Sequence, residues 1–259
     1  MTMDWLQSVR ARADQAPLAA RDALHVAAST HAIGSIERAL ADRMAAAGLP
    51  IVPVSGGWCI TGTPTNAAFA RIAEWLRAQG LASAWRNELL SVTDAAGTSV
   101  GAIERAAVRP LGIATHAAHL VGWAEQGGVW VQQRALDKAT DPGQWDTLVG
   151  GLVAADERVD DTLARETWEE AGLRIGALRD VIACGRLTVR RPLSNGYMVE
   201  HIHVHEAVIP AQLTPLNQDG EVAAFECLST AALQDRLHAG LFTLEAALIL
   251  AEALARRAR

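Results

Sequence analysis

Apolar residues recur at helical spacing in several segments of the chain, each with polar residues on the opposite side. Within the fourth of these segments Asp160 or Asp161 provides a helix start, and Gly172 provides a stop. Gly48 and Gly80 end two earlier segments in the same way. We therefore expect helices over 3–14, 36–47, 65–79, 159–171, 229–237 and 244–256.

Shorter apolar or alternating segments between these helices are typical of β-strands. Residues 51–61 predict one strand bent at Gly56-Gly57. Paired strands are expected around turns at 94–97, 125–128 and 192–196. The predicted strands cover 88–93, 99–103, 119–123, 129–134, 187–191, 198–208 and 221–225.

The character of the chain changes near residues 110–114. The part before this point is rich in alanine and alternates helices with short strands, whereas the part after it carries longer strands. We therefore predict two domains, a small α/β domain over 1–111 and a second domain over 112–259.

Composition narrows the function classes. The chain has 259 residues, half of them hydrophobic, and a net charge of −6 with scattered basic residues, so we expect no nucleic-acid partner. Its three cysteines form neither a disulfide framework nor a CxxC metal site, which suits a reducing compartment. No apolar run resembles a signal peptide or reaches the length needed to cross a bilayer. The expectation is a cytoplasmic protein without a membrane partner.

The candidate chemistry lies in the predicted helix over 159–171. Glu166, Glu169 and Glu170 fall on one face about one turn apart, where three like charges repel. A hard divalent cation such as Mg²⁺ removes that repulsion, because it prefers carboxylate oxygen and shares its shell with phosphates. Arg165 can hold a carboxylate through a forked hydrogen bond, and Gly151 lets the backbone approach a metal or phosphate.

This segment resembles the Nudix box: a glycine (Gly151), five residues, a glutamate (Glu157), seven residues, then Arg-Glu-x-x-Glu-Glu-x-Gly from Arg165 and an apolar residue. Thr167 departs from it by standing where the family often has an aliphatic residue. The resemblance implies a Nudix fold of the α/β (α+β) class, a mixed β-sheet between helices, preceded here by the small α/β domain.

The resemblance also implies a reaction, in which water attacks a phosphorus of a diphosphate linkage in a small molecule. By this likeness Glu166, Glu169 and Glu170 would bind Mg²⁺ or Mn²⁺ with a backbone carbonyl at Gly150 or Gly151. Glu157 and Arg165 would support the cluster.

Two flanking segments, 138–146 and 215–222, resemble one Nudix branch with an extra leading domain, related to the Nudix part of thiamine pyrophosphokinase fusions. That likeness suggests thiamine diphosphate or its oxidised forms as substrate. Nucleoside di- or triphosphates and nucleotide sugars are the alternative substrates. Glu221 is a candidate metal ligand or base from outside the box, and phosphate oxygens are expected to contact Arg134, Lys138, Arg190 and Arg191.

Other interpretations stay open. Residues 142–146 are similar to the pre-box sequence of isopentenyl-diphosphate isomerases, but no cysteine here has the setting those enzymes rely on. A non-catalytic Nudix-fold binding module would usually have lost a box carboxylate, and this chain retains all of them. His201, His203 and His205 share one face of a predicted strand, which favours a pocket wall or a polar sheet face over a zinc site. A homodimer is possible.

Overall fold

The structure is a computed structural model that describes residues 3–257. Its largest element is a mixed sheet in the order β11-β12-β7-β8-β13, with β10 paired to β7 and β9 to β8. Strands β12 and β7 run parallel, and the other pairs are antiparallel. The strands are β7 (Ala114–Ala124), β8 (Val129–Arg134), β9 (Trp145–Asp146), β10 (Val149–Leu152), β11 (Arg179–Leu193), β12 (Gly196–Ile209) and β13 (Val222–Leu228).

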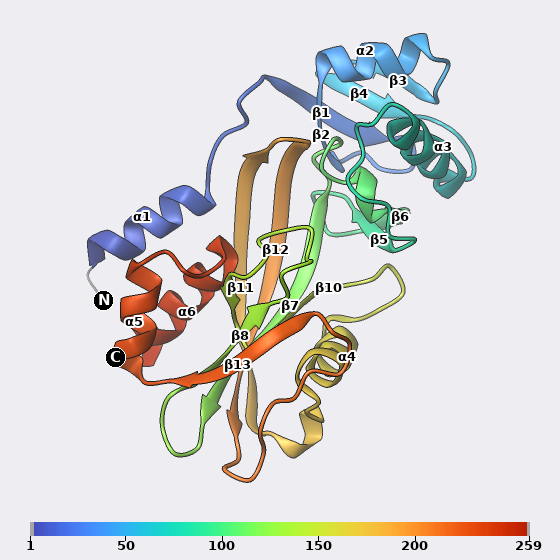
Figure 1. Ribbon diagram of the computed structural model, residues 1–259. Helices are drawn as coiled ribbons and strands as arrows, with labels where there is room; N and C mark the ends of the chain where they lie inside the picture. Colours follow the sequence, from blue (N-terminus) through green and yellow to red (C-terminus); the bar gives the residue numbers. More distant parts are fainter. Residues whose placement is uncertain (1–2, 258–259) are drawn as a thin grey trace.

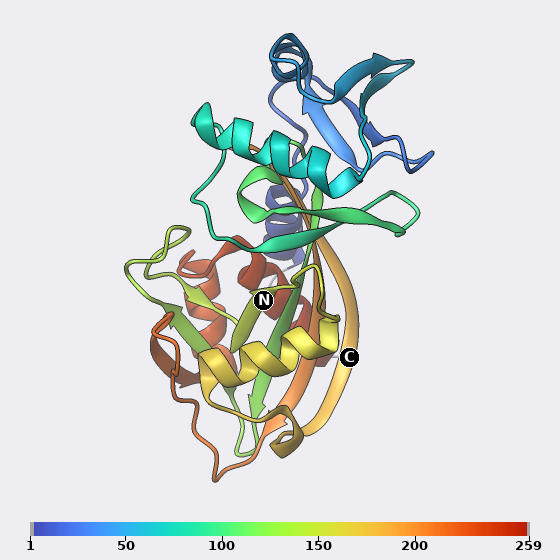
Figure 2. The same ribbon diagram turned by 90° about the vertical axis from the view of Figure 1, so that its right-hand side faces the viewer.

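Helices cover both faces of this sheet (Figures 1 and 2). On one face, α4 (Val159–Ala171) packs Leu163 and Ala171 against Leu120 of β7. The other face buries Val121 and Trp123 against α1 (Met3–Ala13), α5 (Thr230–His238) and α6 (Leu244–Arg257). The alternation of side chains along β7 thus supplies both cores, as expected for a strand covered on its two faces.

The leading part of the chain has its own smaller sheet, in the order β2-β1-β4-β3. Its strands are β1 (Arg21–Val26), β2 (Gly34–Glu37), β3 (Ile51–Val54) and β4 (Gly57–Ile60), and β1 runs parallel to β4. Helices α2 (Arg38–Ala46) and α3 (Thr65–Ala78) share a core with this sheet and with the hairpin of β5 (Leu89–Thr93) and β6 (Ser99–Glu104). Short 3₁₀ turns, η1 (Arg105–Ala107) and η2 (Ile175–Ala177), complete the elements.

Helix α1 lies apart from this small sheet. Its Val9 and Ala13 are buried in the core that α6 forms with the large sheet, and Arg10 pairs with Glu252 of α6. The division into 1–111 and 112–259 stays a prediction, with the first helix packed against the second part.

Several predicted elements differ from the structure. Residues 51–60 form the antiparallel hairpin β3–β4 rather than one bent strand, because Gly56 takes a left-handed φ of 82° and reverses the chain. Ile36 and Glu37 end strand β2 instead of starting a helix. Strand β11 is far longer than the predicted 187–191. Among residues 3–257, no helix is long and apolar enough to cross a membrane.

Candidate active site

Helix α4 carries the predicted carboxylates and spans the predicted residues, but its N-cap is Arg158, without a side-chain cap bond, and not Asp160 or Asp161, which lie in its first turn. It ends where Gly172 adopts a left-handed φ of 64° and donates its N–H to the Trp168 carbonyl. Thr167, which departs from the box pattern, is fully buried. Its hydroxyl donates to the Leu163 carbonyl at 2.6 Å, so the polar atom is satisfied within the helix and only the methyl packs.

Arg165 forms the centre of the charge network. Its Nε and Nη2 donate to the two oxygens of Glu157 at 2.7 and 2.9 Å, a forked pair, and Thr162 donates to the same carboxylate. These bonds, those from Arg165 above all, lower the pKa of Glu157 to about 2. Arg165 Nη1 also donates to Glu166 and Glu169, at 2.8 Å each. One guanidinium therefore joins three of the predicted site carboxylates.

Glu170 lies beneath this network, with 2% of its surface exposed. The Gln132 amide and the Gly150 N–H both donate to its Oε2, at 3.0 and 2.9 Å. Burial, and secondly the charge of Glu166, raises the pKa of Glu170 to about 8 despite these two bonds. Two fixed donors thus orient a carboxylate that lacks a positive partner among the described residues.

Gly151 has no room for a side chain. A Cβ at this position would collide with the Glu166 carboxylate. Burial raises the pKa of Glu166, against the opposing effect of Arg165. The structure therefore brings the backbone of Gly151 into contact with the Glu166 carboxylate.

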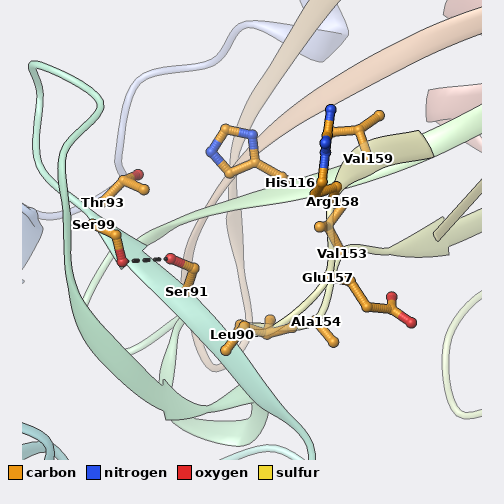
Figure 3. A pocket seen from close by; sticks show the side chains of 11 residues that line it. Leu90, Ser91, Thr93, Ser99, His116, Val153, Ala154, Glu157, Arg158 and Val159 are labelled. Carbon is orange, nitrogen blue, oxygen red and sulfur yellow. Dashed lines mark hydrogen bonds between the residues drawn. The ribbon is translucent and has the colours of Figure 1, made fainter. Parts of the chain in front are cut away.

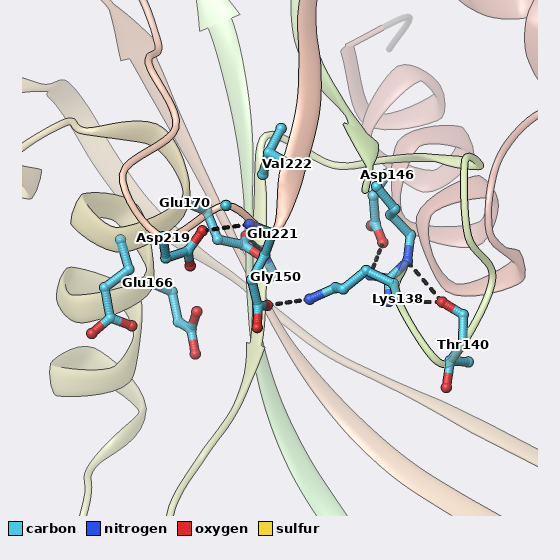
Figure 4. Close-up of polar contacts among 12 residues, drawn as sticks. Lys138, Thr140, Asp146, Gly150, Glu166, Glu170, Asp219, Glu221 and Val222 are labelled. Carbon is cyan, nitrogen blue, oxygen red and sulfur yellow. Dashed lines mark hydrogen bonds and ion pairs between the residues drawn. The ribbon is translucent and has the colours of Figure 1, made fainter. Parts of the chain in front are cut away.

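A second wall faces α4 from two loops (Figure 4). Lys138 forms an ion pair with Glu221 that joins these loops. Burial, the largest single effect, opposes ionisation of Glu221, but the hydrogen bond and charge of Lys138 together with the charges of Arg105 and Arg134 outweigh it and lower the pKa of the carboxyl. Arg134 donates to the Thr140 carbonyl at 3.0 Å and to Asp146 at 3.3 Å, which ties down the loop that carries Lys138.

Arg190 and Arg191 are placed differently from our prediction. Arg190 pairs with Asp14 at the end of α1, and Arg191 donates to Glu245 of α6 at 3.3 Å. Both lie on β11, an edge strand three places from β8 in the sheet order. The structure therefore does not bring them to the glutamates of α4.

The three histidines of β12 meet a fourth from β7. His116 and His203 share a hydrogen bond at 3.0 Å, and His201 bonds to Thr188 at 3.0 Å. Burial, foremost, lowers the pKa of each of the four imidazoles, including His205. These side chains are therefore neutral at pH 7 and form a polar face of the sheet.

Two buried residues that the sequence did not single out complete the site. Gln132 orients Glu170, and its own Oε1 is buried without a hydrogen-bond partner. Asp146 accepts from the Thr147 N–H and from Arg134. Both stand at buried positions of strands, so polar residues inside apolar segments were the available signal.

The carboxylates suit a divalent cation in kind but do not converge on one point. Within residues 3–257, no three His, Cys, Asp or Glu side chains are grouped so that they could hold a metal ion. Arg165 holds one oxygen each of Glu166 and Glu169, whereas Glu170 is held by Gln132 and Gly150. The oxygen donors and the raised pKa values fit a hard cation, provided that Glu166 and Glu169 turn from Arg165 toward Glu170.

A family model and curated relatives of this chain both carry the Nudix name. The NUDIX domain model matches residues 115–248, slightly more than half of the chain. Nudix hydrolase 24, chloroplastic, of Arabidopsis thaliana is 30% identical over 168 residues, 63% of this chain and 46% of that protein. The isopentenyl-diphosphate Delta-isomerase of Streptomyces avermitilis is 32% identical over 152 residues, 58% of this chain and 75% of that protein.

The chain spans about half the length of the first curated relatives that it matches. Among solved structures, a crystal structure from Deinococcus radiodurans matches 60% of this chain and 92% of its own at 25% identity, with a TM-score of 0.49.

Proposed function

The chain belongs to the Nudix family, and we propose that it is a metal-dependent hydrolase that cleaves a diphosphate linkage in a small phosphorylated metabolite. Its fold is the mixed α/β Nudix fold, with the sheet between helices and a small α/β region before it. Family members generally use divalent metal ions, and we propose Mg²⁺ or Mn²⁺ here. The observation that carries the proposal is the complete set of box carboxylates on α4, oriented by Arg165, Gln132 and Gly150.

In this proposal Glu166, Glu169 and Glu170 hold the cation, with the backbone carbonyl of Gly150 or Gly151. When bound, it would neutralise phosphate oxygens and lower the pKa of a water molecule. Glu157 keeps Arg165 in place through the forked pair, so Arg165 stays fixed beside the cation site when Glu166 and Glu169 turn toward Glu170.

The opposite wall supplies the remaining groups. Lys138 and Arg134 pair with Glu221 and Asp146 on this wall. In this proposal the two cations contact phosphate oxygens once a substrate enters between the walls. Because the pKa of Glu221 is lowered, this carboxylate is ionised at neutral pH and is able to take the proton of the attacking water.

For the substrate we propose thiamine diphosphate or one of its oxidised forms. The support is the likeness of 138–146 and 215–222 to the branch related to thiamine pyrophosphokinase fusions, which also carries an extra leading domain. We accordingly propose that residues 1–111 form that leading domain. Nucleotide and nucleotide-sugar diphosphates are the competing substrates.

Isomerisation of a small diphosphate is a second candidate, favoured by the similarity to the Streptomyces isomerase. Against it, the three cysteines lie on β4, β11 and β13, and none hydrogen-bonds a box residue within the described chain. Hydrolysis therefore remains the proposal.

A phosphate-release screen with Mg²⁺ and with Mn²⁺ tests it. The panel contains thiamine diphosphate, its oxidised forms, nucleoside di- and triphosphates, ADP-ribose, dinucleoside polyphosphates and isopentenyl diphosphate. Metal-dependent cleavage of any member supports hydrolysis, and preference for a thiamine form supports the branch. A shifted double bond in isopentenyl diphosphate without cleavage would favour the isomerase. No phosphate release with either metal, together with binding of a panel member, would favour a binding module.

A further inference from the structure

A cavity of about 290 Å³ lies beside the candidate active site, between the leading part of the chain and the segment that enters α4. Hairpin β5–β6 forms one wall, and the segment 153–159 that leads into α4 forms the other (Figure 3). His116 of β7 lies between them. The volume far exceeds the roughly 30 Å³ that one water takes in the liquid. It is near the lower limit of small-ligand sites, about 300 Å³.

The lining is apolar with a few hydrogen-bonding groups. Leu90 and Val153 contribute apolar surface, while the hydroxyls of Ser91 and Ser99 bond to each other at 3.1 Å. Among residues 3–257, the only ionic side chains on the wall are Glu157 and Arg158. The Glu157 carboxylate is taken by Arg165 and points away from the hydroxyls (Figure 3).

Two groups of the lining determine what it can recognise. Arg158 makes no ion pair within residues 3–257, so its guanidinium is free to stack on a ring or to donate to ring nitrogens and carbonyls. His116 shares its Nδ1 with His203 and keeps Nε2 for another partner. Apolar walls, hydroxyls, an imidazole and one guanidinium suit a flat heterocycle with polar edges. No carboxylate is free here to pair with a strongly basic ligand.

The cavity lies at the start of α4, the helix that carries the candidate metal-binding glutamates. Val159 lines the cavity and begins α4, and Glu166 follows seven residues later. At 1.5 Å per residue the two are separated by about 10 Å along the helix. That spacing suits a ring joined to a diphosphate through a sugar or a short chain.

We propose that this cavity binds the organic group of the substrate, a flat nitrogen heterocycle, and that hairpin β5–β6 of the leading part completes the pocket. This proposal rests on the proposed function, because it places the diphosphate on the α4 glutamates. It assigns substrate selection to Ser91 and Ser99, which lie outside the box, and to Arg158, which occupies one of the variable positions of the box.

Ser99→Phe tests the proposal by filling the cavity, and Ala96→Phe is the matched control. Ser99 lines the cavity but is exposed, so a phenylalanine there does not disturb a core. Ala96 is exposed at the tip of the same hairpin and does not line the cavity. KM and kcat are measured for the best substrate of the panel, and the inhibition constant of inorganic diphosphate is measured alongside.

We expect Ser99→Phe to raise KM about tenfold or more while kcat and the inhibition by diphosphate change less than about threefold. Arg158→Ala, at an exposed side chain without an ion pair, is expected to raise KM as well, and Ala96→Phe is expected to change neither constant. An unchanged KM in both Ser99→Phe and Arg158→Ala would overturn the proposed role of the cavity but would not contradict the proposed hydrolase activity.

Binding of phosphate-free thiamine, adenosine and cytidine, measured by calorimetry, separates the two proposals. Suppose that the wild type cleaves no panel member but binds one of these compounds, and that Ser99→Phe loses that binding. The ring-binding role of the cavity is then supported, and the proposed hydrolase activity is wrong. If the wild type neither cleaves a ring-bearing diphosphate nor binds any of the three compounds, the cavity assignment is wrong.

Discussion

Replacing Glu170 by glutamine is expected to abolish hydrolysis and, in protein stripped of metal by a chelator, to raise stability. The two effects share one cause. Glu170 is buried with its Oε2 held by Gln132 and Gly150, and its pKa is raised to about 8 from 4.5, mainly by burial. Glutamine keeps an oxygen for both donors and removes the buried charge.

The sign and size of the stability change follow from that pKa. The folded protein holds a proton on Glu170 that the unfolded chain releases above pH 4.5, so Glu170 lowers stability progressively as pH rises from about 4.5 to about 8. At 1.36 kcal/mol per pH unit, the loss is about 3 kcal/mol at pH 7 and approaches about 5 kcal/mol above pH 8. Glutamine does not titrate and avoids this loss.

Thermal unfolding in chelator from pH 5 to pH 9 is the assay. For a chain of this length, about 3 kcal/mol corresponds to a Tm difference of roughly 6–12 °C. The variant should therefore melt close to the wild type at pH 5 and clearly above it at pH 8. In parallel, its metal-dependent turnover should fall about 100-fold or more. Equal melting curves at all pH values would refute the burial argument, and near-wild-type turnover would refute the metal site.

Three further substitutions probe the neighbouring contacts. Gly151→Ala should lower kcat at least tenfold while the protein remains folded, because the added methyl displaces the Glu166 carboxylate. An unchanged curve in a Mg²⁺ titration of activity would count against that contact. Gln132→Met removes one of the two donors to Glu170 and should weaken Mg²⁺ activation about tenfold with little change in Tm, which a metal titration of activity measures. Thr167→Val should change Tm by less than a few degrees and leave turnover intact, since the hydroxyl bonds only within its own helix; a large loss in either assay would show that the hydroxyl has another role.

The features of α4 that were predicted correctly depend on residues close together in the sequence. The limits of α4 follow from acidic residues at its start and from Gly172 at its end, and helix spacing alone places three glutamates on one face. The contact of Arg165 with Glu169, four residues later, is likewise set by spacing along one helix. Such features need no knowledge of the rest of the chain.

The misplaced and missed features depend on distant pairings. Strand β1 has little apolar alternation, and it becomes a strand through pairing with β2 and with β4. Arg190 and Arg191 are close to the box in sequence, but the position of β11 at the sheet edge takes them to α1 and α6. Gln132 meets Glu170 across 38 residues of chain, so its role was visible only after folding.

The same distinction explains why the box identifies a reaction more readily than a substrate. The groups proposed to hold the cation come mainly from α4 and the adjoining β10, so their spacing alone specifies them. The cavity beside them is assembled from hairpin β5–β6, from β7 and from the segment before α4. A change in the hairpin therefore alters the pocket without touching the carboxylates. If the proposed pocket selects the substrate, substrate choice can change without a change in bond cleavage, and the paired measurements of KM and kcat on Ser99→Phe examine this directly.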